Sequence, residues 1–71
     1  MITEIKIKTP YIELDSFLKF ASLVGTGGEA KIVIQGGEVK VNDTVCTMRG
    51  KKLYGGEVVD VDGEVLKVKK A

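Results

Sequence analysis

The chain has 71 residues, of which 44% are hydrophobic and 30% are charged, and its 11 basic and 10 acidic side chains give a formal net charge of +1. This length predicts a single domain over residues 1–71, whose one small core leaves no room for the deep cleft of a typical enzyme. No apolar run is long enough to span a membrane and no signal-peptide pattern is present, so we expect a cytoplasmic protein. With Cys46 as the only cysteine and no histidine, nothing predicts a disulfide, a nucleophilic cysteine, a metal site or a cofactor.

The first part of the chain predicts one strand and one helix. Ile5–Lys8 alternates apolar and polar residues as a half-buried strand does, and Pro10 ends the strand because proline cannot donate to a ladder. The apolar residues that follow have the i, i+3, i+4, i+7 spacing of an amphipathic helix: Leu14, Phe17, Leu18 and Ala21. This spacing predicts a helix from about Leu14 to Leu23, with Gly25 as its stop.

A second helix is predicted directly afterwards. Thr26–Glu29 has the form of a capping box, in which the threonine hydroxyl accepts from the third helical amide and Glu29 reaches back to the cap amide. Ala30, Val33 and Ile34 would form the apolar face, and Gly36-Gly37 would end the helix. Because helices this short are marginal alone in water, we expect the two helices to pack on each other.

The second half of the chain predicts strands. Val39–Val41 alternates as a strand, and Asn42-Asp43 tolerates the positive φ of a tight turn. The clearest hairpin joins Glu57–Val61 to Glu64–Val68 through Asp62-Gly63, a pair typical of two-residue turns. The element order is therefore strand, helix, helix, then three or four strands.

Several short motifs occur along the chain in a recognisable order. They are Leu14-Asp15-x-x-Leu18, Gly28-Glu29-Ala30-Lys31, Gly37-Glu38-Val39-Lys40-Val41-Asn42, and Arg49-Gly50-Lys51-Lys52-Leu53 followed by Gly56-Glu57. This ordered set resembles the S4 RNA-binding domain, and within that family the small stand-alone S4-like proteins of bacteria (the YaaA/YbcJ type). The resemblance covers the chain from about Ile5 to Val61.

The resemblance implies an α+β fold in which an αL motif, two short packed helices followed by a β-hairpin, lies on a small, mostly antiparallel sheet. It also implies a non-enzymatic, bacterial, ribosome-associated module that binds structured RNA, either ribosomal or tRNA-like, as a monomer. The RNA would meet a basic face of the second helix with the hairpin and loop that follow. The expected RNA-binding residues are Thr26, Gly27, Gly28, Lys31, Lys40, Asn42, Arg49, Lys51 and Lys52.

These residues have the chemistry that RNA contacts need, and each also has a structural alternative. Amides at a helix start and basic side chains bind phosphate, and an asparagine side chain can both donate to and accept from a base or ribose. The alternatives are a turn-forming role for Asn42, the polar side of a helix for Lys31, a flexible helix entry for Gly27-Gly28 and a solvated loop for Arg49–Lys52.

The alternative function is a protein-interaction module that does not bind nucleic acid. The near-neutral net charge, the acidic Glu57–Glu64 hairpin and Glu13, where many S4 domains carry arginine, favour this function. Aromatic residues are few, and we expect Phe17 and Phe20 in the core. Recognition of a folded RNA backbone is therefore expected, rather than base stacking on an exposed aromatic platform.

Overall fold

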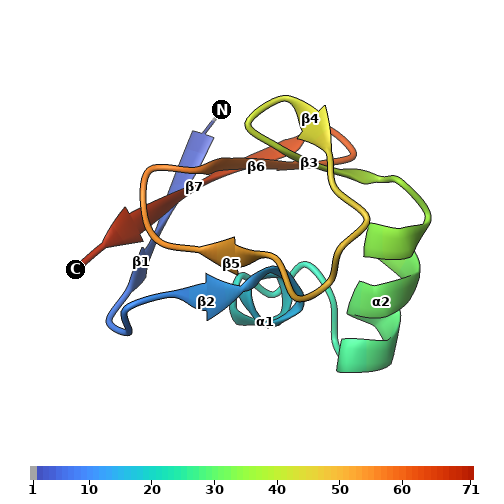
Figure 1. Ribbon diagram of the computed structural model, residues 1–71, viewed down its shortest axis with the longest axis horizontal. Coiled ribbons are helices and arrows are strands. Elements are labelled where there is room, and N and C mark those ends of the chain that lie inside the picture. The colour runs from blue at the N-terminus through green and yellow to red at the C-terminus, as the bar shows by residue number, and fades with distance from the viewer. Residues whose placement is uncertain (1) are drawn as a thin grey trace.

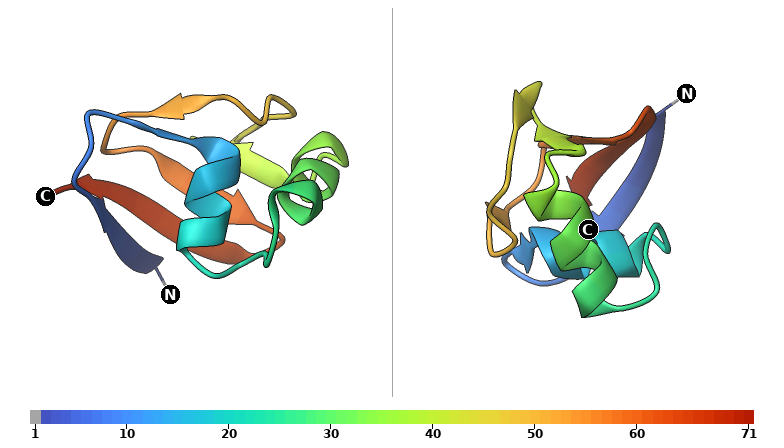
Figure 2. Two further views of the ribbon diagram at one scale, coloured as in Figure 1. Left: turned by 90° about the horizontal axis from the view of Figure 1, so that it is seen from below. Right: turned by 90° about the vertical axis from the view of Figure 1, so that its right-hand side faces the viewer.

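A computed structural model describes residues 2–71 and shows a sheet with two helices and a short strand pair on one side of it (Figures 1 and 2). The elements are β1 (Ile2–Ile7), β2 (Ile12–Glu13), α1 (Leu14–Phe20), α2 (Gly27–Gln35), β3 (Val39–Val41), β4 (Thr44–Val45), β5 (Lys52–Leu53), β6 (Val58–Val61) and β7 (Glu64–Lys70). The sheet has the order β1-β7-β6-β3-β4, and β2 pairs with β5 in a separate ribbon. Only the β1–β7 pair is parallel among the described strands. The predicted α+β fold with a mostly antiparallel sheet is confirmed.

Both predicted two-residue turns are present. Asp62 (φ 48°) and Gly63 (φ 92°) join β6 to β7, and Asn42 (φ 51°) and Asp43 (φ 67°) join β3 to β4. Positive φ at both central residues defines the type I′ turn, whose twist matches that of paired strands. Strand β7 runs on to Lys70, beyond its predicted end, because β1 pairs with it to that point.

Helix α1 ends at Phe20, and the predicted end at Leu23 was wrong. Ser22 takes the left-handed conformation (φ 61°), and the amide of Leu23 donates to the carbonyl of Leu18 at 3.0 Å. This geometry is that of a Schellman motif, which usually has glycine at the left-handed position. The prediction placed the stop at Gly25 because serine is not a typical residue for this conformation.

Helix α2 has the predicted capping box, with one difference. The hydroxyl of Thr26 accepts from the amide of Glu29 at 3.1 Å. The carboxylate of Glu29 accepts from the amide of Gly25 at 2.8 Å, one residue before the cap amide that the prediction named. Glu29 therefore also fixes the loop that enters the helix. Gly37 (φ 81°) ends α2 as predicted.

The core lies between the sheet and the helices, and every buried residue in the described part of the chain is apolar. It contains Leu14, Phe17 and Leu18 from α1, Ala30 and Ile34 from α2, and Val39, Val59, Leu66 and Val68 from the sheet. The prediction for Phe17 is confirmed, since it is fully buried, whereas Phe20 is 61% exposed and its predicted core position was wrong. As the last residue of α1, Phe20 lies at an open apolar hollow beside Ile7 and Ile12.

The ribbon of β2 and β5 was not predicted. It has only two residue pairs, Ile12 with Leu53 and Glu13 with Lys52, so the alternation is too short to stand out in the sequence. Leu53 is fully buried and joins the ribbon to the core. The ribbon also brings the loop before β5 to the start of α1.

Candidate nucleic-acid interface

The segment Arg49–Lys52, here called the basic segment, is fixed by its backbone at the start of α1. The amide of Leu14 donates to the carbonyl of Lys51 at 2.8 Å, and the amide of Asp15 donates to the carbonyl of Arg49 at 3.1 Å. The first amides of a helix have no partner within the helix, and the cap residue of α1 makes no side-chain bond to them. The basic segment supplies the missing acceptors, so its backbone is ordered while its basic side chains stay exposed.

Arg49 leans on the first turn of α1. Its Nε donates to Oδ2 of Asp15 at 3.2 Å, with the arginine side chain 48% exposed and the aspartate side chain 15% exposed. The guanidinium has five N–H donors, and no other hydrogen bond from it is made within residues 2–71. Arg49 is thus held through Nε, and the N–H groups at the end of its guanidinium make no hydrogen bond within residues 2–71.

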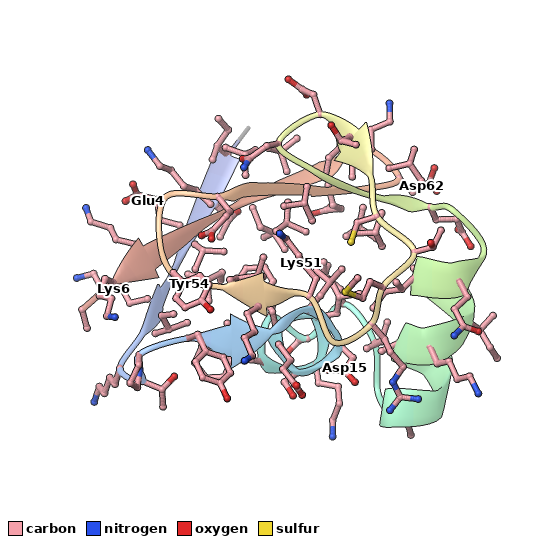
Figure 3. All side chains as sticks on the ribbon, in the orientation of Figure 1. Glu4, Lys6, Asp15, Lys51, Tyr54 and Asp62 are labelled. Carbon is pink, nitrogen blue, oxygen red and sulfur yellow. The ribbon has the colours of Figure 1, made fainter. Side chains whose placement is uncertain are left out.

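The side chain of Lys51 has different neighbours from those of Arg49. It lies between the ribbon and the sheet (Figure 3), where it lines a groove with Met48. The positive charge of Lys51 also lowers the pKa of Glu57. Partial burial raises the pKa of Glu57. The amides of Tyr54 and Gly55 donate to its carboxylate at 2.8 and 2.7 Å, and these bonds together with the charge of Lys51 lower the pKa by more than burial raises it. The net result is a lowered pKa and a carboxylate that fixes the turn after β5.

Lys52 lies on the outer face of the ribbon, opposite Glu13. Its Nζ is 4.9 Å from the centroid of the Tyr11 ring, within the range of a cation–π contact. The cations of the basic segment therefore share one stretch of backbone but have three different neighbours, Asp15, Glu57 and Tyr11.

The start of α2 is open to approach. The hydroxyl of Thr26 is occupied by its capping bond, so this residue positions the helix start. A Cβ at Gly27 would meet nothing within 4 Å, and one at Gly28 would meet only the Thr26 hydroxyl at 3.9 Å, so packing inside the chain does not require either glycine. Lys31 is exposed, one turn into the helix, and no ion pair within the described residues engages it.

Lys40 and Asn42 lie apart from the basic segment. The alternate residues of β3 pack into the core, so Lys40 is on the outer face of the sheet, away from the helices and directly across from Asp60. Both the side chain and the backbone of Asn42 bond to Val58. The side-chain Oδ1 accepts from the amide of Val58 at 3.0 Å, and the backbone amide of Asn42 donates to the Val58 carbonyl at 2.8 Å. The turn-forming alternative for Asn42 is present in the structure, and an RNA contact by either residue stays a prediction.

A pair of exposed aromatic rings was not predicted from the sequence. Tyr11 and Tyr54 are 41% and 56% exposed, and their ring centroids are 5.9 Å apart with an angle of 51° between the planes. The alternation in Tyr11–Glu13 and Lys52–Tyr54 could have predicted this pair, because it places both tyrosines on the face of the ribbon opposite to that of Ile12 and Leu53.

Residues 2–71 contain no group of three histidine, cysteine, aspartate or glutamate side chains placed to hold a metal ion. Within the same residues, no helix has the length and apolar character needed to cross a membrane.

A capped helix pair that leads into a short hairpin, with an exposed basic segment fixed beside it, is the arrangement of an S4-type domain. The family model for the S4 domain matches residues 5–69, and the chain belongs to this family. The family expected from the short motifs is therefore confirmed.

Proteins similar in sequence support this assignment. The chain is 44% identical over 63 residues to the "Probable ribosome maturation protein RlbA" of Bacillus subtilis, which covers 89% of each protein. It is 36% identical over 61 residues to YbcJ of Escherichia coli, covering 86% of this chain and 87% of YbcJ. The solution structure of YbcJ, described as revealing an αL motif involved in RNA-binding, aligns with a TM-score of 0.68 and 32% identity over 96% of this chain and 85% of that one.

A more distant structure shares the fold alone. The 30S ribosomal protein S4e of Thermoplasma acidophilum aligns with a TM-score of 0.61 at 19% identity, over 82% of this chain and 31% of S4e.

Proposed function

We propose that this chain binds structured RNA through the basic segment and the start of α2. The observation that carries the proposal is the backbone anchoring of Arg49–Lys52 on α1, which orders the backbone of a segment with three exposed basic residues. Phosphate groups are bound well by basic side chains whose positions are set in advance, because less side-chain freedom is lost on binding. Membership of the S4 domain family and the similarity to YbcJ, described as having an αL motif involved in RNA-binding, support the same function.

Within this proposal the predicted residues have different roles. Arg49, Lys31 and Lys52 contact phosphate, and the amides of Gly27 and Gly28 provide further donors at the start of α2. Thr26 acts indirectly by capping that helix. Lys51 adds charge from the neighbouring groove, whereas Lys40 and Asn42 contact RNA only if it extends past the β3–β4 turn.

Ribosomal RNA is the target we propose, since one relative is named for ribosome maturation. The chain would act in the cytoplasm as a monomer and without catalysis. Sedimentation with ribosomal subunits and their precursors tests the target, and light scattering of the free protein tests the monomer.

The RNA-binding face is tested by a charge-matched pair of triple variants. The first replaces Arg49, Lys51 and Lys52 with alanine, and the second replaces Lys6, Lys67 and Lys69 on the outer face of β1 and β7. Each removes three positive charges, so the two are matched in net charge and differ in where the charge is lost. Affinity for ribosomal RNA is measured across a salt series after circular dichroism has confirmed folding.

The first variant should bind more weakly and with a salt dependence reduced by about 1.5–2 in log–log slope, because Arg49 and Lys52 each lose a phosphate contact that contributes about 0.7–0.9. The second should keep nearly the wild-type slope. Equal losses in both variants would mean that only net charge matters and would reject the proposed face.

A protein-interaction function remains the competing proposal, and one observation favours it. Val45 and Met48, 51% and 64% exposed, line the groove beside Lys51. A folded wild-type protein that binds no RNA at low salt, but retains a protein partner after nuclease treatment, would favour that function.

A further inference from the structure

The exposed tyrosine pair follows directly from the register of the β2–β5 ribbon. Ile12 pairs with Leu53, so the next pair outward is Tyr11 with Tyr54, on the opposite face. Leu53 points into the core and is fully buried, while the two rings point to solvent. Figure 1 shows that this end of the ribbon lies away from α2, with the basic segment at the other end of β5.

Two lysine ammonium groups lie close to this end of the ribbon. The Nζ of Lys52 is 4.9 Å from the Tyr11 centroid, and the Nζ of Lys70 donates to the carbonyl of Pro10, the residue before Tyr11, at 3.0 Å. The acidic residues nearby are Glu13, across from Lys52 in the ribbon, and Glu57, whose carboxylate is taken up by backbone amides. The rings thus form an aromatic surface with one ammonium group over Tyr11 and a second beside Pro10.

We infer that Tyr11 and Tyr54 form a stacking site for an unpaired nucleotide base of the bound RNA. Aromatic rings beside cations suit this ligand, because a base stacks on the ring while its phosphate meets the ammonium group. One face of Tyr11 is covered by Lys52, so Tyr54, the more exposed ring, is the principal platform. The site continues the basic segment along β5, and the inference rests on the RNA binding proposed above.

This site changes the kind of RNA that the protein would select. The basic segment and the start of α2 provide charge and amides, which bind the backbone of any suitably shaped RNA. A stacking site adds a preference for a helix that carries an unpaired nucleotide next to it. The alternative is that the two rings only stabilise the ribbon as a cross-strand pair.

The test uses two RNA probes, a stem with one unpaired 2-aminopurine beside it and the same stem fully paired. Wild type is compared with Tyr54→Leu, Tyr54→Phe and, as a matched control, Phe20→Leu, which removes a ring of similar exposure at the end of α1. Thermal unfolding of each variant establishes that it is folded. The chain has two tyrosines and no tryptophan, so its intrinsic emission comes from this pair and gives a second signal.

Tyr54→Leu should weaken binding of the unpaired probe on the order of tenfold and abolish the change in 2-aminopurine fluorescence, because stacking contributes roughly that much per base. Tyr54→Phe and Phe20→Leu should bind as wild type, and the paired stem should bind equally to all four proteins. Tyrosine emission should change with the unpaired probe only.

Other outcomes overturn the inference. Salt-dependent binding of both probes that Tyr54→Leu leaves unchanged would reject the stacking site and retain the proposed RNA-binding function. An equal loss with both probes would assign the pair a structural role. No binding of either probe by folded wild type would reject the stacking site and the proposed function together.

Discussion

Replacing Asn42 separates two contributions to the stability of the β3–β4 turn. The backbone of this residue is left-handed (φ 51°), and its side-chain oxygen accepts from the amide of Val58 at 3.0 Å. Alanine disfavours the conformation and lacks the acceptor, glycine removes only the acceptor, and aspartate keeps both features. The three substitutions therefore form a graded series at one site.

The expected losses follow from these differences. The left-handed conformation costs alanine about 1–2 kcal/mol, and the lost hydrogen bond costs about 1 kcal/mol. Asn42→Ala should therefore destabilise by about 2–3 kcal/mol, Asn42→Gly by about 1 kcal/mol, and Asn42→Asp by less than about 0.5 kcal/mol. A domain of this size has a total stability of only about 4–10 kcal/mol, so the alanine variant should be clearly affected.

Urea unfolding followed by circular dichroism measures the series. Equal stability of the alanine and glycine variants would refute the contribution of the left-handed conformation, and an aspartate variant as unstable as alanine would refute that of the acceptor. Asn42→Asp also tests the RNA role, since it should fold normally but place a negative charge at the turn. A folded variant with weakened RNA binding would favour a direct contact by Asn42.

Three further results are expected. Asp15→Asn should raise RNA affinity by roughly twofold to fivefold in the salt titration, because it removes a negative charge that competes with phosphate for Arg49 and leaves the backbone bonds that hold the basic segment in place; a lower affinity would mean that the ion pair is needed to position Arg49 for binding. Because the pKa of Glu57 is lowered in the folded state, its carboxylate contributes stability at pH values above the ordinary pKa of 4.5, and this contribution is lost as the pH falls through the folded pKa. In Glu57→Gln the unfolding midpoint should therefore depend less on pH over that acidic range, and an unchanged pH profile would contradict this. Ser22→Gly should raise stability by about 0.5–1 kcal/mol, because glycine takes the left-handed position without steric cost, and a lower melting temperature would argue against it.

Local patterns in the sequence predicted the parts of the fold that local chemistry determines. Asp62-Gly63 and Asn42-Asp43 tolerate the positive φ values of their turns, and the hydroxyl of Thr26 caps α2 as its motif indicates. The end of α1 escaped prediction because Ser22 adopts a conformation that its side chain does not favour. The hydrogen bond that the amide of Leu23 donates to the carbonyl of Leu18 offsets part of that cost.

The rest of the fold and site depends on contacts between distant segments. The β2–β5 ribbon has two residue pairs and becomes stable only when Leu53 enters the core. The sequence therefore identified Arg49 and Lys52 as basic but not their partners, Asp15 and Tyr11. It also placed Lys40 with them, although the pleat of β3 puts that residue on the outer face of the sheet.

The parallel pairing of β1 with β7 has a consequence for synthesis of the chain. Ile2 pairs with Val65, so about 60 residues lie between the partners, and closing a loop of that length costs about 3–4 kcal/mol in chain entropy. Strand β1 sits at the sheet edge and has no other strand partner among the described residues. During translation β1 emerges well before β7 and cannot pair until β7 has been made. We therefore expect the helix pair to form early and the sheet to close only once β7 has left the ribosomal exit tunnel.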